Sequence, residues 1–157
     1  MPSARPMTPT EEKIGSTVIH YVARVNTWLY RASGGKVFGK WLRGAPIGLL
    51  QYRGRKSGRT LTTPLLYLRD GDRVVIVASK GGMSHHPLWY RNLVDEPDCE
   101  FEIGTERRPY RARTATSEEK KAYWPRLVAM YPDYDDYQAR TDRDIPVVIL
   151  DPMSPSG

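Results

Sequence analysis

Residues 53–82 read R-G-R-K-S-G-R-T-L-T-T-P-L-L-Y-L-R-D-G-D-R-V-V-I-V-A-S-K-G-G. Two strand-like runs flank the D-G-D turn signal, which predicts a β-hairpin. If its arms run antiparallel, the basic glycine loop before the first arm meets the K-G-G segment after the second, and Lys80 joins the first group of cations. A concavity of main-chain N–H groups and cations favours an anionic, phosphate-bearing ligand. The cations of the first loop are Arg53, Arg55, Lys56 and Arg59.

Length and composition indicate a single globular domain. The chain has 157 residues, of which 39% are hydrophobic and 27% are charged. A chain of this size buries about 70% of its unfolded surface. No run approaches the roughly 18 apolar residues of a membrane span, and the N-terminus lacks the apolar core of a signal peptide, so we expect a cytoplasmic protein. The single cysteine, Cys99, excludes an internal disulfide and fits a buried apolar position.

Positive charge gathers in the first half of the chain. Residues 1–80 carry 14 Lys and Arg against 4 Asp and Glu, a net charge of +10, whereas residues 81–157 carry 10 against 14, a net charge of −4. This distribution predicts that an anion binds near the glycine loops. The anion could be a cofactor tail, a lipid surface or a nucleic acid. A solvated basic turn is the structural alternative, but the cations are interleaved with glycine rather than with acidic partners.

The N-terminal part is expected to be separate from the main domain. We expect a disordered segment over 1–9, an amphipathic helix with its connector over 10–43, the main domain over 44–152 and a tail over 153–157. Apolar residues recur at three- and four-residue spacing between Ile14 and Trp28, which predicts one apolar helical stripe. The stripe either packs on the domain's own core or, because basic and aromatic residues accompany it, contacts the inner face of the cell membrane.

The main domain is predicted to be mainly β. Near-continuous apolar runs such as 74–78 imply strands buried on both faces, as inside a barrel. Short helices are expected at 87–93, at 116–130 behind a capping box, and at 134–140. Six mostly antiparallel strands with helices packed at the side predict an α+β fold built on a small barrel. The expected strands are 46–52, 60–68, 73–79, 98–103, 108–114 and 145–150. The oligomeric state is left open.

No set of residues with a local catalytic signature is present. His85 and His86 are adjacent and no cysteine or histidine elsewhere completes a metal site, so we expect no metal. The profile is that of an enzyme in which a cofactor carries the chemistry. Tyr131, Tyr134 and Tyr137 are spaced by three, which suits either core packing or the wall of a pocket for a planar ligand. Their distance along the chain from the basic stretch argues against a nucleic-acid module.

Several linked motifs resemble one known family. They are R-G-R-K-S-G-R-T at 53–60, P-L-L-Y-L-R-D-G-D-R-V-V-I-V-A-S-K-G-G at 64–82, H-P-L-W-Y-R-N-L at 86–93, Y-W-P-R-L-V-A-M-Y-P-D-Y-D-D-Y-Q at 123–138 and T-D-R-D-I-P-V-V-I-L at 141–150. In this order they resemble the deazaflavin-dependent nitroreductase family of actinobacteria, over about residues 44–152. The resemblance implies a split β-barrel that binds coenzyme F-420, an 8-hydroxy-5-deazaflavin with a phosphate and oligoglutamate tail.

The resemblance also assigns roles to residues. It implies that Arg55, Lys56, Ser57, Gly58, Arg59 and Thr60 hold the phosphate and tail. It implies that the deazaflavin is lined, partly by main-chain contacts, by Leu49, Leu50, Gln51, Pro64, Leu65, Leu66, Tyr67, Ile76, Val77, Ala78, Ser79 and Lys80, with Trp89 and Asn92 nearby in a short helix. The substrate side would be formed by Ser79, Tyr131, Tyr134 and Tyr137.

The activity implied is hydride transfer from the reduced deazaflavin to a planar electrophilic acceptor, which is a quinone such as menaquinone, an activated enone or a nitroaromatic compound. We expect Ser79 and Tyr134 to donate hydrogen bonds to the acceptor, with Tyr131 and Tyr137 as the closing wall. Members of the family often carry a tyrosine where this chain has Leu66, so nitro-prodrug reduction is expected to suffer more than cofactor binding. The alternatives are an FMN-binding split-barrel oxidoreductase and a non-catalytic deazaflavin carrier.

Overall fold

The computed structural model describes residues 8–10 and 45–153 of the chain. The predictions for the amphipathic helix over 10–43 and for the tail therefore fall almost entirely outside the described residues. Seven strands, all paired antiparallel, form one sheet in the order β2-β1-β5-β6-β7-β4-β3. The strands are β1 (Ile47–Arg53), β2 (Thr60–Leu66), β3 (Leu68–Asp70), β4 (Arg73–Val77), β5 (Asp98–Ile103), β6 (Glu106–Thr114) and β7 (Val147–Pro152).

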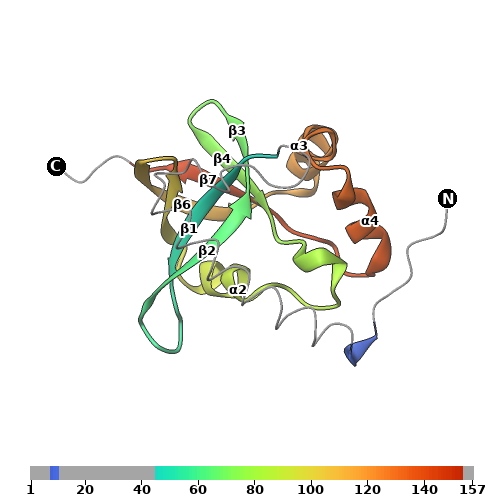
Figure 1. Ribbon diagram of the computed structural model, residues 1–157, viewed down its shortest axis with the longest axis horizontal. Helices are drawn as coiled ribbons and strands as arrows, with labels where there is room; N and C mark the ends of the chain where they lie inside the picture. The colour runs from blue at the N-terminus through green and yellow to red at the C-terminus, as the bar shows by residue number, and fades with distance from the viewer. Residues whose placement is uncertain (1–7, 11–44, 154–157) are drawn as a thin grey trace.

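The sheet curls into a barrel. Its two outermost strands, β2 and β3, stand at opposite ends of the strand order, yet only Tyr67 separates them in the chain. The ends of the sheet must therefore come together, as Figure 1 shows for β2 and β3, both in green. The predicted α+β, mainly β fold is confirmed.

One predicted strand, residues 60–68, is in fact two. The Tyr67 amide donates to the carbonyl of Pro46 at 3.3 Å, just beyond the last β1–β2 pair, Ile47 with Leu66. The chain then leaves β1, and Leu68 pairs with Val75 of β4. The D-G-D turn is correct, with Gly71 at φ +60°, but the long hairpin predicted across it was wrong. It is only three residues deep, and β2 is paired with β1.

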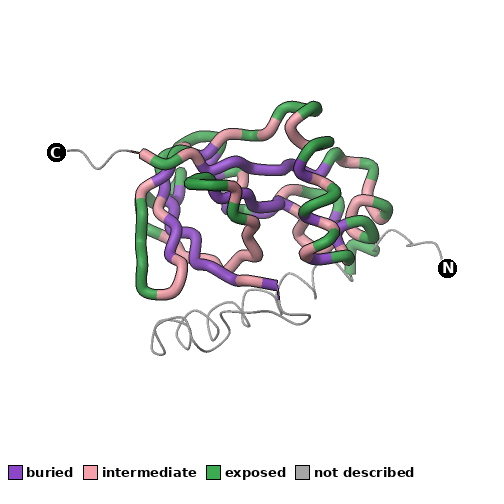
Figure 2. Tube along the Cα trace, turned by 90° about the horizontal axis from the view of Figure 1, so that it is seen from above, coloured by how far each residue is buried: buried purple, intermediate pink, exposed green. Residues whose placement is uncertain are grey.

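Two apolar clusters share the sheet. The inner cluster fills the barrel and includes Leu50, Ile76, Phe101 and Leu150, whereas the outer cluster lies between the sheet and the C-terminal helices. Alternate residues of β4 and β7 face the two clusters, which explains why both strands read as continuous apolar runs. Figure 2 shows these buried positions running through the middle of the trace, with exposed positions on the outer turns.

Between residues 45 and 153, three α-helices and one 3-10 helix pack around the barrel. Helix α2 (Leu88–Asp95) inserts Trp89 and Leu93 into the inner cluster. Helices α3 (Ser117–Met130) and α4 (Asp133–Arg140) pack on the outer cluster, and η2 (Lys80–Gly82) lies against α4. The predicted capping box is present: Thr116 Oγ1 accepts from the Glu119 amide, and Glu119 accepts from the Thr116 amide. Within the described ranges, no helix is long and apolar enough to cross a membrane.

Candidate functional site

The basic glycine motif forms the tip of the β1–β2 hairpin, which projects from the body of the fold in Figure 1. The Gly54 amide donates to the Arg59 carbonyl and the Gly58 amide donates to the Gly54 carbonyl, both at 2.8 Å. Gly58 adopts φ +68°, which a side chain would disfavour. All residues from Arg55 to Thr60 are exposed. The motif therefore presents its side chains to solvent from a closed turn.

Asn92 fixes this loop rather than facing solvent. It is 2% exposed; its Oδ1 accepts from the Arg55 amide at 2.7 Å and its Nδ2 donates to the Leu88 carbonyl at 2.9 Å. Arg59 likewise donates its amide to Ser57 Oγ at 3.2 Å. The amides of Gly54, Arg55, Gly58 and Arg59 are thus already bonded. The predicted concavity of free main-chain amides was wrong in these four positions, and an anion here would be bound mainly by side-chain cations.

Two of the loop's cations have acidic partners that the sequence reading did not anticipate. Arg55 lies 3.6 Å from Asp95, and Arg53 lies 3.9 Å from Glu96, at the end of α2. By contrast, Lys56 and Arg59 form no ion pair with any residue that the structure describes. These two side chains carry the positive charge that remains available to a ligand.

Lys80 does not join these cations. In Figure 1 α2 lies between the hairpin tip and η2, and Lys80 Nζ contacts His85 Nε2 at 2.6 Å. The predicted meeting of the two basic loops was therefore wrong, because it required β2 to pair with β4. The K-G-G segment instead forms a left-handed turn with φ of +44°, +63° and +77° at Lys80, Gly81 and Gly82. A Cβ at Gly82 would lie 2.6 Å from the Tyr137 carbonyl oxygen, so glycine lets the turn pack directly on α4.

The three predicted tyrosines do meet. The ring centroids of Tyr131 and Tyr134 are 5.1 Å apart, and both lie within 6.3 Å of the ring of Tyr137. Tyr131 and Tyr134 are buried in the outer cluster, while Tyr137 is half-buried. Core packing, one of the two alternatives left open by the sequence, is therefore observed, and α4, which carries Tyr134 and Tyr137, also contacts η2. The pocket wall stays a prediction.

Of the four hydroxyls predicted for the substrate side, two bond to each other and two bond to none of the described residues. Tyr131 Oη and Tyr137 Oη are 3.2 Å apart and share a hydrogen bond. The Tyr134 hydroxyl, on a residue only 3% exposed, and the Ser79 hydroxyl form no hydrogen bond with the part of the chain that the structure describes. Burial, followed by the neighbouring tyrosines, raises the pKa of Tyr134. Tyr134 therefore keeps its proton at neutral pH and can donate it in a hydrogen bond.

Most residues expected to line the deazaflavin belong to the barrel wall. Leu50, Ile76, Ala78 and Trp89 are buried in the inner cluster, so their side chains serve the core. Gln51 donates to Glu102 at 3.0 Å. Leu49 is fully buried and pairs with Pro64 across the β1–β2 ladder. Leu65 and Tyr67 pack against the inner cluster. Leu66 and Val77 instead pack in the outer cluster, with the tyrosines.

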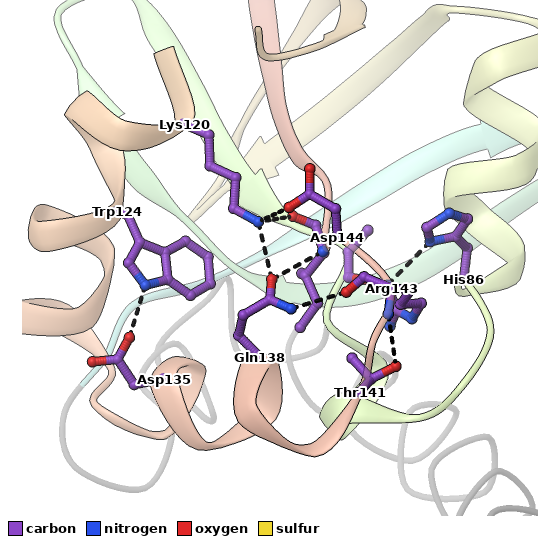
Figure 3. Close-up of polar contacts among 10 residues, drawn as sticks. His86, Lys120, Trp124, Asp135, Gln138, Thr141, Arg143 and Asp144 are labelled. Carbon is purple, nitrogen blue, oxygen red and sulfur yellow. Dashed lines mark hydrogen bonds and ion pairs between the residues drawn. The ribbon is translucent and has the colours of Figure 1, made fainter. Parts of the chain in front are cut away.

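Three polar residues near η2 were missed by the sequence reading. Arg143 lies within the quoted motif over 141–150 but between two aspartates, a pattern typical of a solvated loop. In the structure the Arg143 guanidinium donates to main-chain carbonyls on both sides of η2. The guanidinium also contacts His86, and Gln138 donates to the Arg143 carbonyl (Figure 3). No pattern in one sequence separates such an arginine from an exposed one. Across the described residues, no group of three or more potential metal ligands occurs.

Comparison with known proteins gives a consistent match. The family model of F420H2-dependent quinone reductases matches residues 22–152. Two Mycobacterium tuberculosis proteins are similar: Rv3178 is 49% identical over 107 residues, covering 68% of this chain and 90% of its own length, and the F420H2-dependent quinone reductase Rv1261c is 38% identical over 133 residues, covering 81% and 87%.

Solved structures agree with the sequence matches. A structure described as a domain-swapped dimer has a TM-score of 0.66 and 35% identity, covering 81% of this chain and 96% of that one. The F420-H2-dependent reductase FDR-A has a TM-score of 0.64 and 38% identity, and the match covers 68% of this chain and 94% of FDR-A. The resemblance drawn from the motifs is confirmed, and with it coenzyme F-420 as the cofactor implied by membership. The chain belongs to the F420H2-dependent quinone reductase family.

Proposed function

We propose that this chain uses reduced coenzyme F-420 to reduce a quinone beside η2 and α4, with Ser79 and Tyr134 as the groups that meet the acceptor. The observation that carries the proposal is the pair of hydroxyls without hydrogen bonds to the described residues, one of them on the deeply buried Tyr134. Buried polar groups are normally hydrogen-bonded, and among the described residues no fully buried side-chain nitrogen or oxygen atom lacks a partner. We take a hydroxyl that bonds to none of these residues as a group suited to a ligand.

The positive charge of the β1–β2 loop also matches the negative charge of the cofactor. F-420 carries a phosphate and an oligoglutamate tail, and Lys56 and Arg59 offer exposed cations at the tip of a turn that is held rigid by its own hydrogen bonds and by Asn92. Charge-assisted hydrogen bonds to phosphate contribute roughly 1.5–3 kcal/mol each. We assign these two side chains to the tail, and Ser57 and Thr60, also exposed on the loop, to its supporting contacts.

When bound in its reduced form, F-420 supplies a hydride. A quinone that accepts one hydride and one proton becomes a hydroquinone, and negative charge develops on its oxygen between the two events. We assign Ser79 and Tyr134 to donate hydrogen bonds to that oxygen, because such donors stabilise the charge that develops on it. The proton reaches the oxygen from Tyr134 or from solvent through it.

The other two tyrosines shape the acceptor's side. Because the Tyr131 and Tyr137 hydroxyls bond to each other, one of their two O–H hydrogens is already used, and the pair offers mainly ring surface. Such surface suits a flat, apolar acceptor. Leu66 packs on the same cluster and adds no hydroxyl. We therefore expect quinones to be preferred over nitroaromatic compounds, which gain more from additional donors.

The test is an acceptor panel. Purified full-length protein is mixed with reduced F-420 and, separately, a menaquinone analogue, an activated enone and a nitroarene, while cofactor absorbance is followed. We expect acceptor-dependent oxidation that is fastest with the quinone. Binding of F-420 without acceptor-dependent oxidation would show a carrier, and uptake of FMN in place of F-420 would show a flavin enzyme. Either outcome would overturn the proposal.

A further inference from the structure

The guanidinium of Arg143 holds the two ends of the η2 turn together. Its Nη1 donates to the Ala78 carbonyl at 3.1 Å, its Nη2 to the Ser79 carbonyl at 2.6 Å and its Nε to the Met83 carbonyl at 2.8 Å. The first two carbonyls precede the turn and the third follows it. One planar, permanently charged group therefore bridges the residues on either side of Lys80–Gly82.

The turn needs such a bridge. Lys80 has φ +44°, a left-handed conformation that costs a non-glycine residue about 1–2 kcal/mol. Within η2 the amides of Gly82 and Met83 donate to the carbonyls of Ser79 and Lys80, at 2.9 and 3.2 Å. A strained backbone of this kind persists only where its surroundings hold it in place.

Arg143 is itself held by a hydrogen bond from helix α4. Gln138 of α4 donates from Nε2 to the Arg143 carbonyl at 2.9 Å, and its Oε1 accepts from the Ile145 amide and from Lys120 Nζ, both at 3.0 Å. Lys120 of α3 also donates to the Ile145 carbonyl at 2.8 Å. Figure 3 shows these contacts as one continuous network. Gln138 follows Tyr137 directly in the chain, so the network joins α4, which carries Tyr134 and Tyr137, to the η2 turn that follows Ser79.

His86 completes the network on its far side. Its Nδ1 lies 3.0 Å from Arg143 Nη1, and because a guanidinium only donates, this nitrogen must be unprotonated. Burial, followed by the charges of Arg143, Arg91 and His85, lowers the pKa of His86. The ring of Tyr90 covers it at 4.9 Å between ring centroids. Protonation of His86 would place two donors against each other and weaken the grip of Arg143.

We propose that Arg143 is a positioning residue, which sets Ser79 and Lys80 against the tyrosines of α4, and that neutral His86 is the acceptor that keeps its guanidinium in place. The proposal rests on the proposed function for its effect on turnover, but the effect on the η2 turn is independent of it. Lysine cannot replace Arg143, because one ammonium cannot reach carbonyls on both sides of the turn in a fixed plane.

The first experiment measures the turn without any cofactor. Hydrogen exchange of the peptide containing Gly82 and Met83 is compared between the wild type, Arg143→Lys and the control Arg111→Lys, whose guanidinium pairs with Asp98 on the surface. We expect exchange at least tenfold faster in Arg143→Lys and unchanged in the control. Equal protection in all three proteins would overturn the structural part of the proposal, even if the protein proves inactive.

The second experiment measures turnover in the same proteins. We expect Arg143→Lys to lower kcat/KM for the quinone at least tenfold while the Kd for F-420 changes less than threefold, because the tail-binding loop is remote from η2. His86→Gln, whose amide oxygen accepts without titrating, should retain activity and lose the acid limb of the kcat/KM profile. An Arg143→Lys enzyme with wild-type kcat/KM, or an unchanged acid limb in His86→Gln, would refute the positioning role. Absence of turnover in every protein, wild type included, would refute the proposed function instead.

Discussion

Tyr134 is the residue on which the proposed chemistry depends most. Its ring is part of the outer cluster and its hydroxyl bonds to none of the described residues, so Tyr134→Phe removes a donor without disturbing the packing. We expect the variant to fold normally, to bind F-420 as the wild type does, and to lose kcat by on the order of 10²-fold, as for other lost transition-state donors. Steady-state kinetics and a cofactor titration measure both.

Tyr137→Phe is the matched control, because it removes a hydroxyl that is already bonded to Tyr131. A smaller loss of kcat is expected there. Equal turnover in Tyr134→Phe and wild type would exclude Tyr134 as the donor, and equal losses in the two variants would show that the hydroxyls act as a group.

Alanine substitutions at Gly81 and Gly82 distinguish the cost of backbone strain from the cost of steric crowding. Both have positive φ, but a Cβ at Gly81 meets no atom within 4 Å, while one at Gly82 would meet the backbone of Tyr137 at 2.6 and 2.9 Å. Gly81→Ala should lower the free energy of unfolding by about 1–2 kcal/mol, and Gly82→Ala by a further 1–3 kcal/mol or so from overpacking. Urea unfolding compares them. The same loss in both variants would contradict the close approach of η2 to α4.

Single residues also show where sequence reasoning stops. The burial of Cys99 and the spacing of the tyrosines follow from local pattern and were confirmed. The roles of Asn92 and Arg143 do not follow from local pattern, because each side chain bonds to main-chain atoms of a segment at least 37 positions away. Partners so distant are set by topology, which a local pattern does not contain.

At the scale of elements, the β1–β2 loop carries the salt-dependent part of cofactor binding. Lys56 is exposed and has no ion pair within the described residues, so Lys56→Ala should weaken F-420 binding about tenfold at low ionic strength. Salt screens such contacts, so the difference between variant and wild type should shrink as salt is added. Arg108→Ala, whose side chain pairs with Glu106 on another hairpin, is the control. Unchanged affinity in Lys56→Ala would exclude this residue from tail binding.

Glu119 in helix α3 makes the free energy of unfolding depend on pH in the acid range. Hydrogen bonds from Arg113 and then from the Thr116 amide lower the pKa of Glu119 from its ordinary value of 4.5 to about 2. A depressed carboxylate pKa contributes stability that is complete above 4.5 and is lost as pH falls through 2. The free energy of unfolding of the wild type should therefore fall between these values.

In Glu119→Gln this part of the pH dependence should be absent, while the side chain can still satisfy the capping box. Urea unfolding at a series of pH values measures it. Parallel pH profiles for the variant and the wild type would show that Glu119 contributes no such linkage.

The elements themselves were largely predictable. Turn residues, the capping box and apolar runs located the helices and six of the seven strands close to their observed bounds. The exception was the break at Tyr67: residues 60–68 are continuous in β-propensity, so nothing local marks the change of partner from β1 to β4. The error in pairing then produced the error in placing Lys80.

At the scale of the whole molecule, barrel closure explains why the two halves of the site stay apart. The cationic loop lies at the tip of one hairpin, with α2 between it and η2 (Figure 1). Ser79 directly precedes η2, and Tyr134 belongs to α4, which contacts η2. A ligand with a planar head and a long charged tail is the kind that spans such a surface. The family assignment and the geometry therefore support the same cofactor from independent directions.

The most direct test is a single-turnover reaction. Protein loaded with reduced F-420 at low ionic strength is mixed rapidly with a menaquinone analogue, and oxidation of the cofactor is followed together with formation of the hydroquinone. We predict one phase in which both signals change together in equal amounts, slowed in Tyr134→Phe. A loaded protein whose cofactor stays reduced in the presence of the quinone would contradict the account.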